Sequence, residues 1–306
     1  MYGGKSLTIG KLKEIGKKQL KNLEDGNIKA HILLGFILNM SNSELVIYEN
    51  KSVDEQDVNA YLQYLNEVKE GYPVQYITHN QAFMGLDFYV DENVLIPQPD
   101  TEILVEEAIR VINEKNTNIA KDINKREKVI DAQEINQEEY NVLDLCTGSG
   151  AIAISIAKYT NAKVYASDVS NEALNVARKN AKKHETNIEF INSDMFNNIE
   201  KNDFDIIVSN PPYIEKSTIP LLDKEVQSEP QIALDGGDDG LDFYRIISEQ
   251  AYRFLKKNGS LMLEIGYNQK NSVSELLAQN EHYSNIECIK DLAGNDRVII
   301  ARVNKI

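Results

Sequence analysis

The first part of the chain has apolar residues at the spacing of α-helices. Leu12, Ile15 and Leu23 recur at helical intervals, and residues 28–38 are apolar on nearly every side, so we expect a buried helix there. We therefore interpret residues 1–80 as a small helical domain.

The apolar period then changes. Phe83, Leu86 and Phe88 alternate with polar residues before the apolar run Val94-Leu95-Ile96, which favours a short β-hairpin. We expect residues 81–98 to form a hairpin that links the helical domain to the rest of the chain.

From residue 141 onward, short apolar runs alternate with amphipathic ones. Strands are expected at 142–145, 163–167, 188–191, 206–209, 261–265 and 298–303, and helices at 103–112, 151–159, 171–183, 240–256 and 268–278. This alternation is typical of a doubly wound α/β domain, which we assign to 99–306. Residues 113–140, rich in Asn, Lys, Glu, Asp and Gln, are interpreted as a solvated insertion in it.

Composition narrows the class of protein. The net charge of −15 over 306 residues disfavours a nonspecific nucleic-acid binder, and no run of eighteen apolar residues indicates a membrane span. The two cysteines, Cys146 and Cys288, stand apart from any Cys/His cluster, so we expect free thiols, no metal and a cytoplasmic location. Seven lysines in residues 1–30 form either a solvated helix face or a docking surface for an acidic partner.

Candidate ligand-binding residues follow the predicted strands. The loop Cys146-Thr147-Gly148-Ser149-Gly150 joins a strand to a helix, and its glycines permit a tight turn and close approach of a ligand. The loop lacks both the GxGxxG spacing of dinucleotide enzymes and a phosphate-binding lysine, which favours an adenosine ligand without phosphates.

Acidic residues follow the next two strands. Asp168 is placed to accept hydrogen bonds from a ribose diol, although a helix cap or a solvated acid is the alternative. Asp194 is suited to accept from an adenine amino group, and Met195 either packs on the adenine face or fills the core.

The segment Asn210-Pro211-Pro212-Tyr213 comes directly after a predicted buried strand. Two prolines fix φ and remove two N–H donors, which leaves the local carbonyls free to accept. Together with the Asn210 side chain, they form a rigid set of acceptors suited to a planar –NH₂ group. The alternative is a turn that the prolines merely stiffen.

These motifs together resemble class I S-adenosylmethionine-dependent methyltransferases, and more narrowly the bacterial peptide chain release factor glutamine methyltransferases. The resemblance rests on blocks at 71–77, 95–102, 142–151, 209–214, 229–241 and 291–297. Gln98 stands where that family usually has Arg, and Cys146 where it usually has Gly.

The resemblance implies a seven-stranded methyltransferase domain that uses S-adenosylmethionine to methylate the amide nitrogen (N5) of the glutamine in a release factor's Gly-Gly-Gln motif. The cofactor would contact Cys146, Thr147, Gly148, Ser149, Gly150, Asp168, Met195 and Asn210. The glutamine would be bound by Asn210, Pro211, Pro212 and Tyr213, with Asn210, Pro211 and Tyr213 catalytic.

We hypothesise that the Asn210 side-chain oxygen and the Pro211 carbonyl accept the two amide N–H bonds, while Tyr213 packs on the amide plane. Residues 1–96 would recognise the protein substrate. Phe83 and Phe88 belong either to the wall of the glutamine slot or to the core.

Three rival functions remain at this stage. They are glutamine methylation of a ribosomal protein, adenine-N6 methylation of DNA, and a cofactor-binding scaffold without activity. The acidic balance disfavours DNA, so neither nucleic acid nor membrane is an expected partner.

Overall fold

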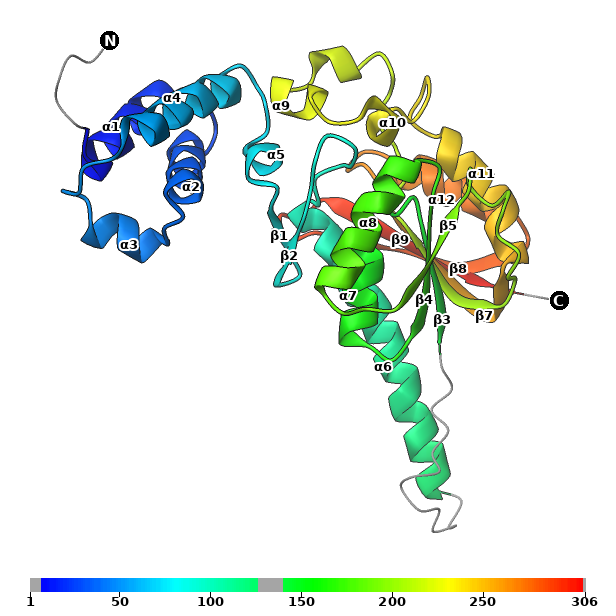
Figure 1. Ribbon diagram of the computed structural model, residues 1–306. Coiled ribbons are helices and arrows are strands. Elements are labelled where there is room, and N and C mark those ends of the chain that lie inside the picture. Colours follow the sequence, from blue (N-terminus) through cyan, green and yellow to red (C-terminus); the bar gives the residue numbers. More distant parts are fainter. Residues whose placement is uncertain (1–6, 126–139, 305–306) are drawn as a thin grey trace. The chain divides into compact units, whose positions relative to one another are not determined.

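The computed structural model describes residues 7–125 and 140–304, and it divides into two compact units (Figure 1). The helical unit comprises residues 1–80 together with 222–228, and the sheet unit comprises residues 81–221 and 229–306. The short segment 222–228 therefore belongs to the helical unit, although it lies far from it in the sequence.

The helical unit consists of short helices, and all of those described except Lys224–Gln227 contribute residues to one apolar core. They are α1 (Ile9–Gln19), α2 (Gly26–Leu38), α3 (Asn42–Ile47), α4 (Glu55–Lys69), α5 (Val74–Thr78) and α9 (Lys224–Gln227). Their local starts are encoded in the sequence: Thr8 caps α1, and Ser41 forms a capping box with Glu44 at α3. Lys29 on α2 forms an ion pair with Glu225 on α9.

The expectation that residues 28–38 form a helix buried all round is wrong. One face of α2 is buried through Ala30, Leu33 and Leu34. Its other face is open to solvent at Ile28, Ile32 and Phe36, whose exposed fractions are 55%, 42% and 45%. A small unit has too little interior to enclose every side of one helix.

The sheet unit confirms the expected doubly wound α/β fold with seven strands. Their order across the sheet is β5-β4-β3-β6-β7-β9-β8, and β9 runs antiparallel to both of its neighbours. The strands are β3 (Asn141–Leu145), β4 (Lys163–Asp168), β5 (Ile188–Asn192), β6 (Phe204–Ser209), β7 (Leu255–Glu264), β8 (Tyr283–Lys290) and β9 (Asp296–Val303). The chain turns from one half of the sheet to the other between β3 and β6, where open α/β sheets bind ligands.

Helices cover both faces of this sheet (Figure 1). α6 and α7 pack in one apolar core on one face, and α11 and α12 contribute to a second core on the other. The helices are α6 (Glu102–Lys125), α7 (Ala151–Tyr159), α8 (Asn171–Lys183), α10 (Gln231–Leu234), α11 (Asp242–Gln250) and α12 (Lys270–Ala278), with short 3₁₀ turns at Pro99–Thr101, Ile219–Leu221 and Ala251–Arg253. None of the described helices is both long enough and apolar enough to cross a membrane.

The hairpin consists of β1 (Gln81–Phe83) and β2 (Leu86–Phe88). Phe83 and Phe88 are fully buried and pack edge to face in the core of the sheet unit. The structure therefore favours the core alternative over a wall of the glutamine slot for both rings.

Several elements differ from those expected. The helix predicted at 240–256 ends at Gln250, because the chain enters β7 at Leu255. β8 was missing from the predicted strands, since its alternate residues are only half buried and carry a weak apolar pattern. α6 continues to Lys125, into the segment interpreted as a solvated insertion, and residues 126–139 lie outside the described residues.

Candidate active site

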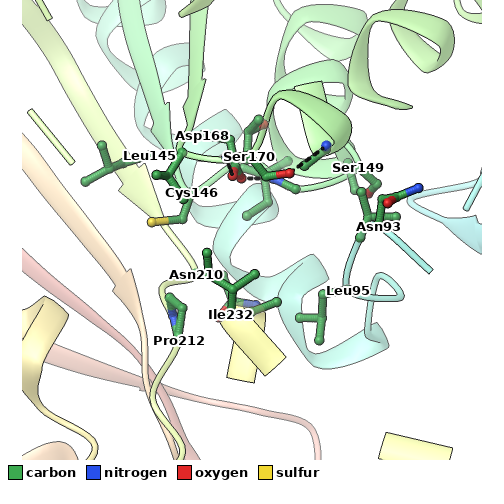
Figure 2. A pocket seen from close by; sticks show the side chains of 18 of the residues that line it. Asn93, Leu95, Leu145, Cys146, Ser149, Asp168, Ser170, Asn210, Pro212 and Ile232 are labelled. Atoms are coloured by element: carbon green, nitrogen blue, oxygen red, sulfur yellow. Dashed lines mark hydrogen bonds between the residues drawn. The ribbon is translucent and has the colours of Figure 1, made fainter. Parts of the chain in front are cut away.

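A cavity lies at the carboxyl ends of β3, β4 and β6 (Figure 2). Asp168 and Ser170 lie on one side of it, and Asn210 and Pro212 on the other. Of the residues predicted to bind ligands, the cavity is lined by Cys146, Thr147, Gly148, Ser149, Asp168, Asp194, Met195, Asn210 and Pro212. Gly150, Pro211 and Tyr213 are adjacent in sequence but do not line it.

The two loop glycines have different roles. Both have positive φ, +54° at Gly148 and +82° at Gly150. A Cβ at Gly148 would meet nothing within 4 Å, so this backbone is open to a ligand. A Cβ at Gly150 would lie 3.1 Å from the Cβ of Ala177 on α8, which makes Gly150 a packing residue where α7 begins.

Asp144, at the end of β3, stabilises the loop through hydrogen bonds from the protein interior. This fully buried side chain accepts hydrogen bonds at Oδ2 from the Thr147 hydroxyl (2.5 Å) and from the Ala153 backbone N–H (3.1 Å). Burial raises its pKa to about 7, against the lowering effect of those two hydrogen bonds. Asp144 thus ties the loop to the first turn of α7.

Asp168 presents its carboxylate to the cavity. Oδ2 accepts from the Gly148 N–H and Oδ1 from the Ser170 N–H, each at 2.9 Å, and burial raises the pKa of the group. Each carboxylate oxygen can accept a further hydrogen bond, as two ribose hydroxyls would require. The residue that caps α8 is Ser170, so Asp168 is not used as the helix cap.

Two further residues that line the cavity, Cys146 and Met195, also pack in the interior of the sheet unit. Cys146 has φ +63°, a conformation that favours glycine, and burial raises the pKa of its thiol above the usual range. Met195 lines the cavity and also belongs to an apolar core of the sheet unit, so its two expected roles are compatible.

Asn210 is fixed in one orientation at the end of β6. Its Nδ2 donates to the Thr101 hydroxyl oxygen at 3.2 Å. Within residues 7–125 and 140–304, no hydrogen bond is donated to Asn210 Oδ1 or to the Pro211 carbonyl oxygen. The Tyr213 carbonyl, by contrast, accepts from Gln269 Nε2 at 3.0 Å and is already used by the protein.

The structure adds lining residues that the motifs alone did not single out. Leu95, Gln98 and Thr101 come from the 95–102 block, and Ile232 from the 229–241 block. In the sequence, only the resemblance of these two blocks to the methyltransferase family pointed to these residues. Gln98 donates to the Ile96 carbonyl at 3.0 Å, so it makes a neutral contact in place of an ionic one.

One buried hydrogen bond connects these two blocks. The Glu229 carboxylate accepts from the Ile96 backbone N–H at 2.8 Å. It holds the chain that follows the Asn-Pro-Pro-Tyr segment against the 93–98 wall of the cavity.

Comparisons with known proteins agree with this geometry. Residues 12–78 match the family described as PrmC N-terminal domain, and residues 127–294 match Methyltransferase small domain. The chain is 40% identical over 278 residues to the release factor glutamine methyltransferase of Clostridium acetobutylicum, covering 89% of this chain and 90% of that one. It is 35% identical over 282 residues to the protein of the same name from Moorella thermoacetica, covering 91% and 92%.

Among solved structures, a methyltransferase from Pyrococcus furiosus superposes with a TM-score of 0.51 at 20% identity. The match covers 80% of this chain and 99% of that one. At this identity the similarity supports the fold alone.

Proposed function

The chain belongs to the family of release factor glutamine methyltransferases, and from this premise we propose that it methylates the side-chain amide nitrogen of the Gly-Gly-Gln glutamine in peptide chain release factors, with S-adenosylmethionine as donor. The observation that carries the proposal is the orientation of Asn210. Its Nδ2 donates to Thr101, and its oxygen is left as an acceptor at the cavity that Asp168 and Gly148 also line.

The cavity fits S-adenosylmethionine chemically. The Asp168 carboxylate suits a ribose diol, the open backbone at Gly148 admits close contact, and Met195 offers an apolar face to adenine. When bound, this cofactor supplies a methyl group on a positively charged sulfur, which needs no further activation.

Orientation is the main problem in this reaction, because an amide nitrogen is a poor nucleophile whose lone pair is delocalised into the carbonyl. We propose that Asn210 Oδ1 and the Pro211 carbonyl accept the two N–H bonds of the glutamine amide. This fixes the nitrogen, and such positioning supplies up to about 7–11 kcal/mol in favourable cases. The same acceptors stabilise the positive charge that develops on nitrogen, and the extra proton leaves for water after the transfer.

We also propose roles for the two units and for Tyr213. Residues 1–80 would bind the release factor, and the sheet unit would hold the cofactor and the glutamine. Tyr213 would pack on the amide and exclude water; its ring is partly buried against the apolar core that also contains Met195. We place the enzyme in the cytoplasm, where release factors act, without direct contact to nucleic acid.

The substrate is tested by incubating the protein with methyl-labelled S-adenosylmethionine and a purified release factor. We expect label in the wild-type release factor and none when its Gly-Gly-Gln glutamine is replaced by alanine. Label in a ribosomal protein or in DNA instead would refute the assignment.

The role of Asn210 is tested with Asn210→Ala, and Asn202→Ala serves as the control because Asn202 is exposed in the loop before β6. Asn210→Ala should lower kcat by at least about 100-fold, equivalent to roughly 3 kcal/mol of orientation and charge stabilisation. Its cofactor Kd should change by less than about threefold. An Asn210→Ala enzyme as fast as the control would contradict the mechanism.

A further inference from the structure

A buried polar network lies beside Asn210: of its members, Thr101 lines the cavity, whereas Glu264 and Arg297 do not. Strand register places it there: Ser209 on β6 pairs with Leu263 on β7, so that the next residues, Asn210 and Glu264, are neighbours at the carboxyl ends of two parallel strands. Glu264 in turn pairs with Val298 on β9, next to Arg297.

Glu264 is an unusual residue for this position. Its side chain is 2% exposed, and Oε2 has no hydrogen-bond partner among the described residues. Burial raises its pKa to about 7, whereas the nearby Thr101 hydroxyl and the charge of Arg297 lower it. An acidic group costs free energy at such a site, so a purely structural role would be better served by an apolar residue.

Arg297 holds the same network from the other side. Its guanidinium lies 2.9 Å from an Asp100 carboxylate oxygen and 3.2 Å from one of Asp291. Asp100 and Thr101 are consecutive in the turn before α6, so this ion pair also fixes the backbone that carries the Thr101 hydroxyl.

The single proton of the Thr101 hydroxyl decides how Asn210 is oriented. A threonine hydroxyl can either accept from an amide NH₂ or donate to an amide oxygen, and these choices favour opposite flips of the asparagine. If the hydroxyl donates its proton to the Glu264 carboxylate, only acceptance from Asn210 Nδ2 remains, and that hydrogen bond is observed at 3.2 Å.

We propose that Glu264 and Thr101 are positioning residues for the methyl transfer: the ionised Glu264 carboxylate accepts a hydrogen bond from the Thr101 hydroxyl, Thr101 then accepts from Asn210 Nδ2, and Asn210 Oδ1 is thereby turned toward the glutamine amide. Without this relay, Asn210 can present its own NH₂ to the substrate NH₂, and two donors then face each other. The inference rests on the proposed function, since it concerns the same amide substrate.

The test compares Thr101→Val, Thr101→Ser, Glu264→Met and the Thr101→Val/Glu264→Met double variant under single-turnover conditions with a release factor. Thr101→Val keeps the shape of the side chain but removes the hydroxyl, and Thr101→Ser keeps the hydroxyl. We expect Thr101→Val and Glu264→Met each to lower the single-turnover rate by about 10- to 100-fold, with the half-saturating release-factor concentration and the Kd for cofactor within about threefold of wild type. Thr101→Ser should remain within threefold in rate.

The double variant distinguishes a relay from two separate structural effects. Residues that act as one unit lose their effect together, so the double variant should be no slower than the slower single variant. Multiplied losses, or a Thr101→Val enzyme with the wild-type rate, would overturn the inference. If Glu264→Met does not fold, the comparison of Thr101→Val with Thr101→Ser decides it alone. Failure of wild type to methylate a release factor would refute the proposed function instead.

Discussion

Replacing Gly148 by alanine measures directly how closely a ligand approaches the loop after β3. The added methyl group would have no protein atom within 4 Å, so it creates no clash in the free protein. The substitution still has a backbone cost, because φ at this residue is +54° and an alanine there costs about 1–2 kcal/mol.

Gly85, at the turn between β1 and β2, provides a matched control. Its φ is +71°, and an added Cβ would make only an ordinary contact, 3.7 Å from the Tyr159 hydroxyl oxygen. Both alanine variants should therefore lose a similar 1–2 kcal/mol in the free energy of unfolding, roughly. Of these two glycines, Gly148 lines the cavity and Gly85 does not.

Cofactor affinity should then separate the two variants. Overfilling a packed contact by one methyl group costs about 1–3 kcal/mol, which corresponds to a roughly 5- to 150-fold weaker Kd. We expect this loss for Gly148→Ala and a change below about twofold for Gly85→Ala, measured by titration calorimetry with S-adenosylhomocysteine. Wild-type affinity in Gly148→Ala would show that the ligand does not approach this backbone, and equal losses in both variants would refute a local effect.

Three further predictions concern charge and packing. Asp168→Asn should weaken cofactor binding by roughly 10- to 100-fold in the same titration, because charge-assisted hydrogen bonds contribute about 1.5–3 kcal/mol; an unchanged Kd would exclude Asp168 from the ribose contact. Asp144 and Glu264 have folded pKa values of about 7, above their ordinary 3.8 and 4.5, so the folded state retains protons that the unfolded chain has released. The contribution of these two groups to the free energy of unfolding should be full below about pH 4, fall as pH rises toward 7 and level off above it. In chemical denaturation at a series of pH values, the free energy of unfolding of Glu264→Gln should depend less steeply on pH than that of wild type, by about a few kcal/mol at most. An equally steep dependence would contradict this. Gly16→Ala should lower the melting temperature of the helical unit despite alanine's higher helix propensity, because the new Cβ would lie 2.1 Å from the Tyr61 hydroxyl oxygen, and adding Tyr61→Phe should recover part of the loss.

Local pattern predicted most of the elements that build the site. The strands that precede the cofactor loop, Asp168 and Asn210 were recognised from apolar runs, because a parallel strand buried on both faces is rich in apolar residues along its length. The position of these polar residues just after the strands then indicated the ligand edge of the sheet. The fold class and the general location of the cavity could therefore be predicted from local pattern.

The apolar pattern was less informative where residues are only partly buried, or where a segment packs in a different unit from the residues next to it in the sequence. β8 has half-buried positions and was missed, and α2 has an apolar surface on a face that the small unit does not enclose. The inclusion of 222–228 in the helical unit has no local signature, because it depends on contacts between residues nearly two hundred positions apart, such as Lys29 and Glu225.

The amino-acid sequence by itself determined which chemical groups stand at the ends of the strands, since periodicity and proline geometry act over a few residues. Only the tertiary structure decided which of those groups are free to bind: it engages the Tyr213 carbonyl with Gln269, leaves Asn210 Oδ1 open and places Glu264 beside Asn210. The physical reason is that hydrogen-bond availability depends on neighbours supplied by strand pairing and burial, and those neighbours are distant along the chain.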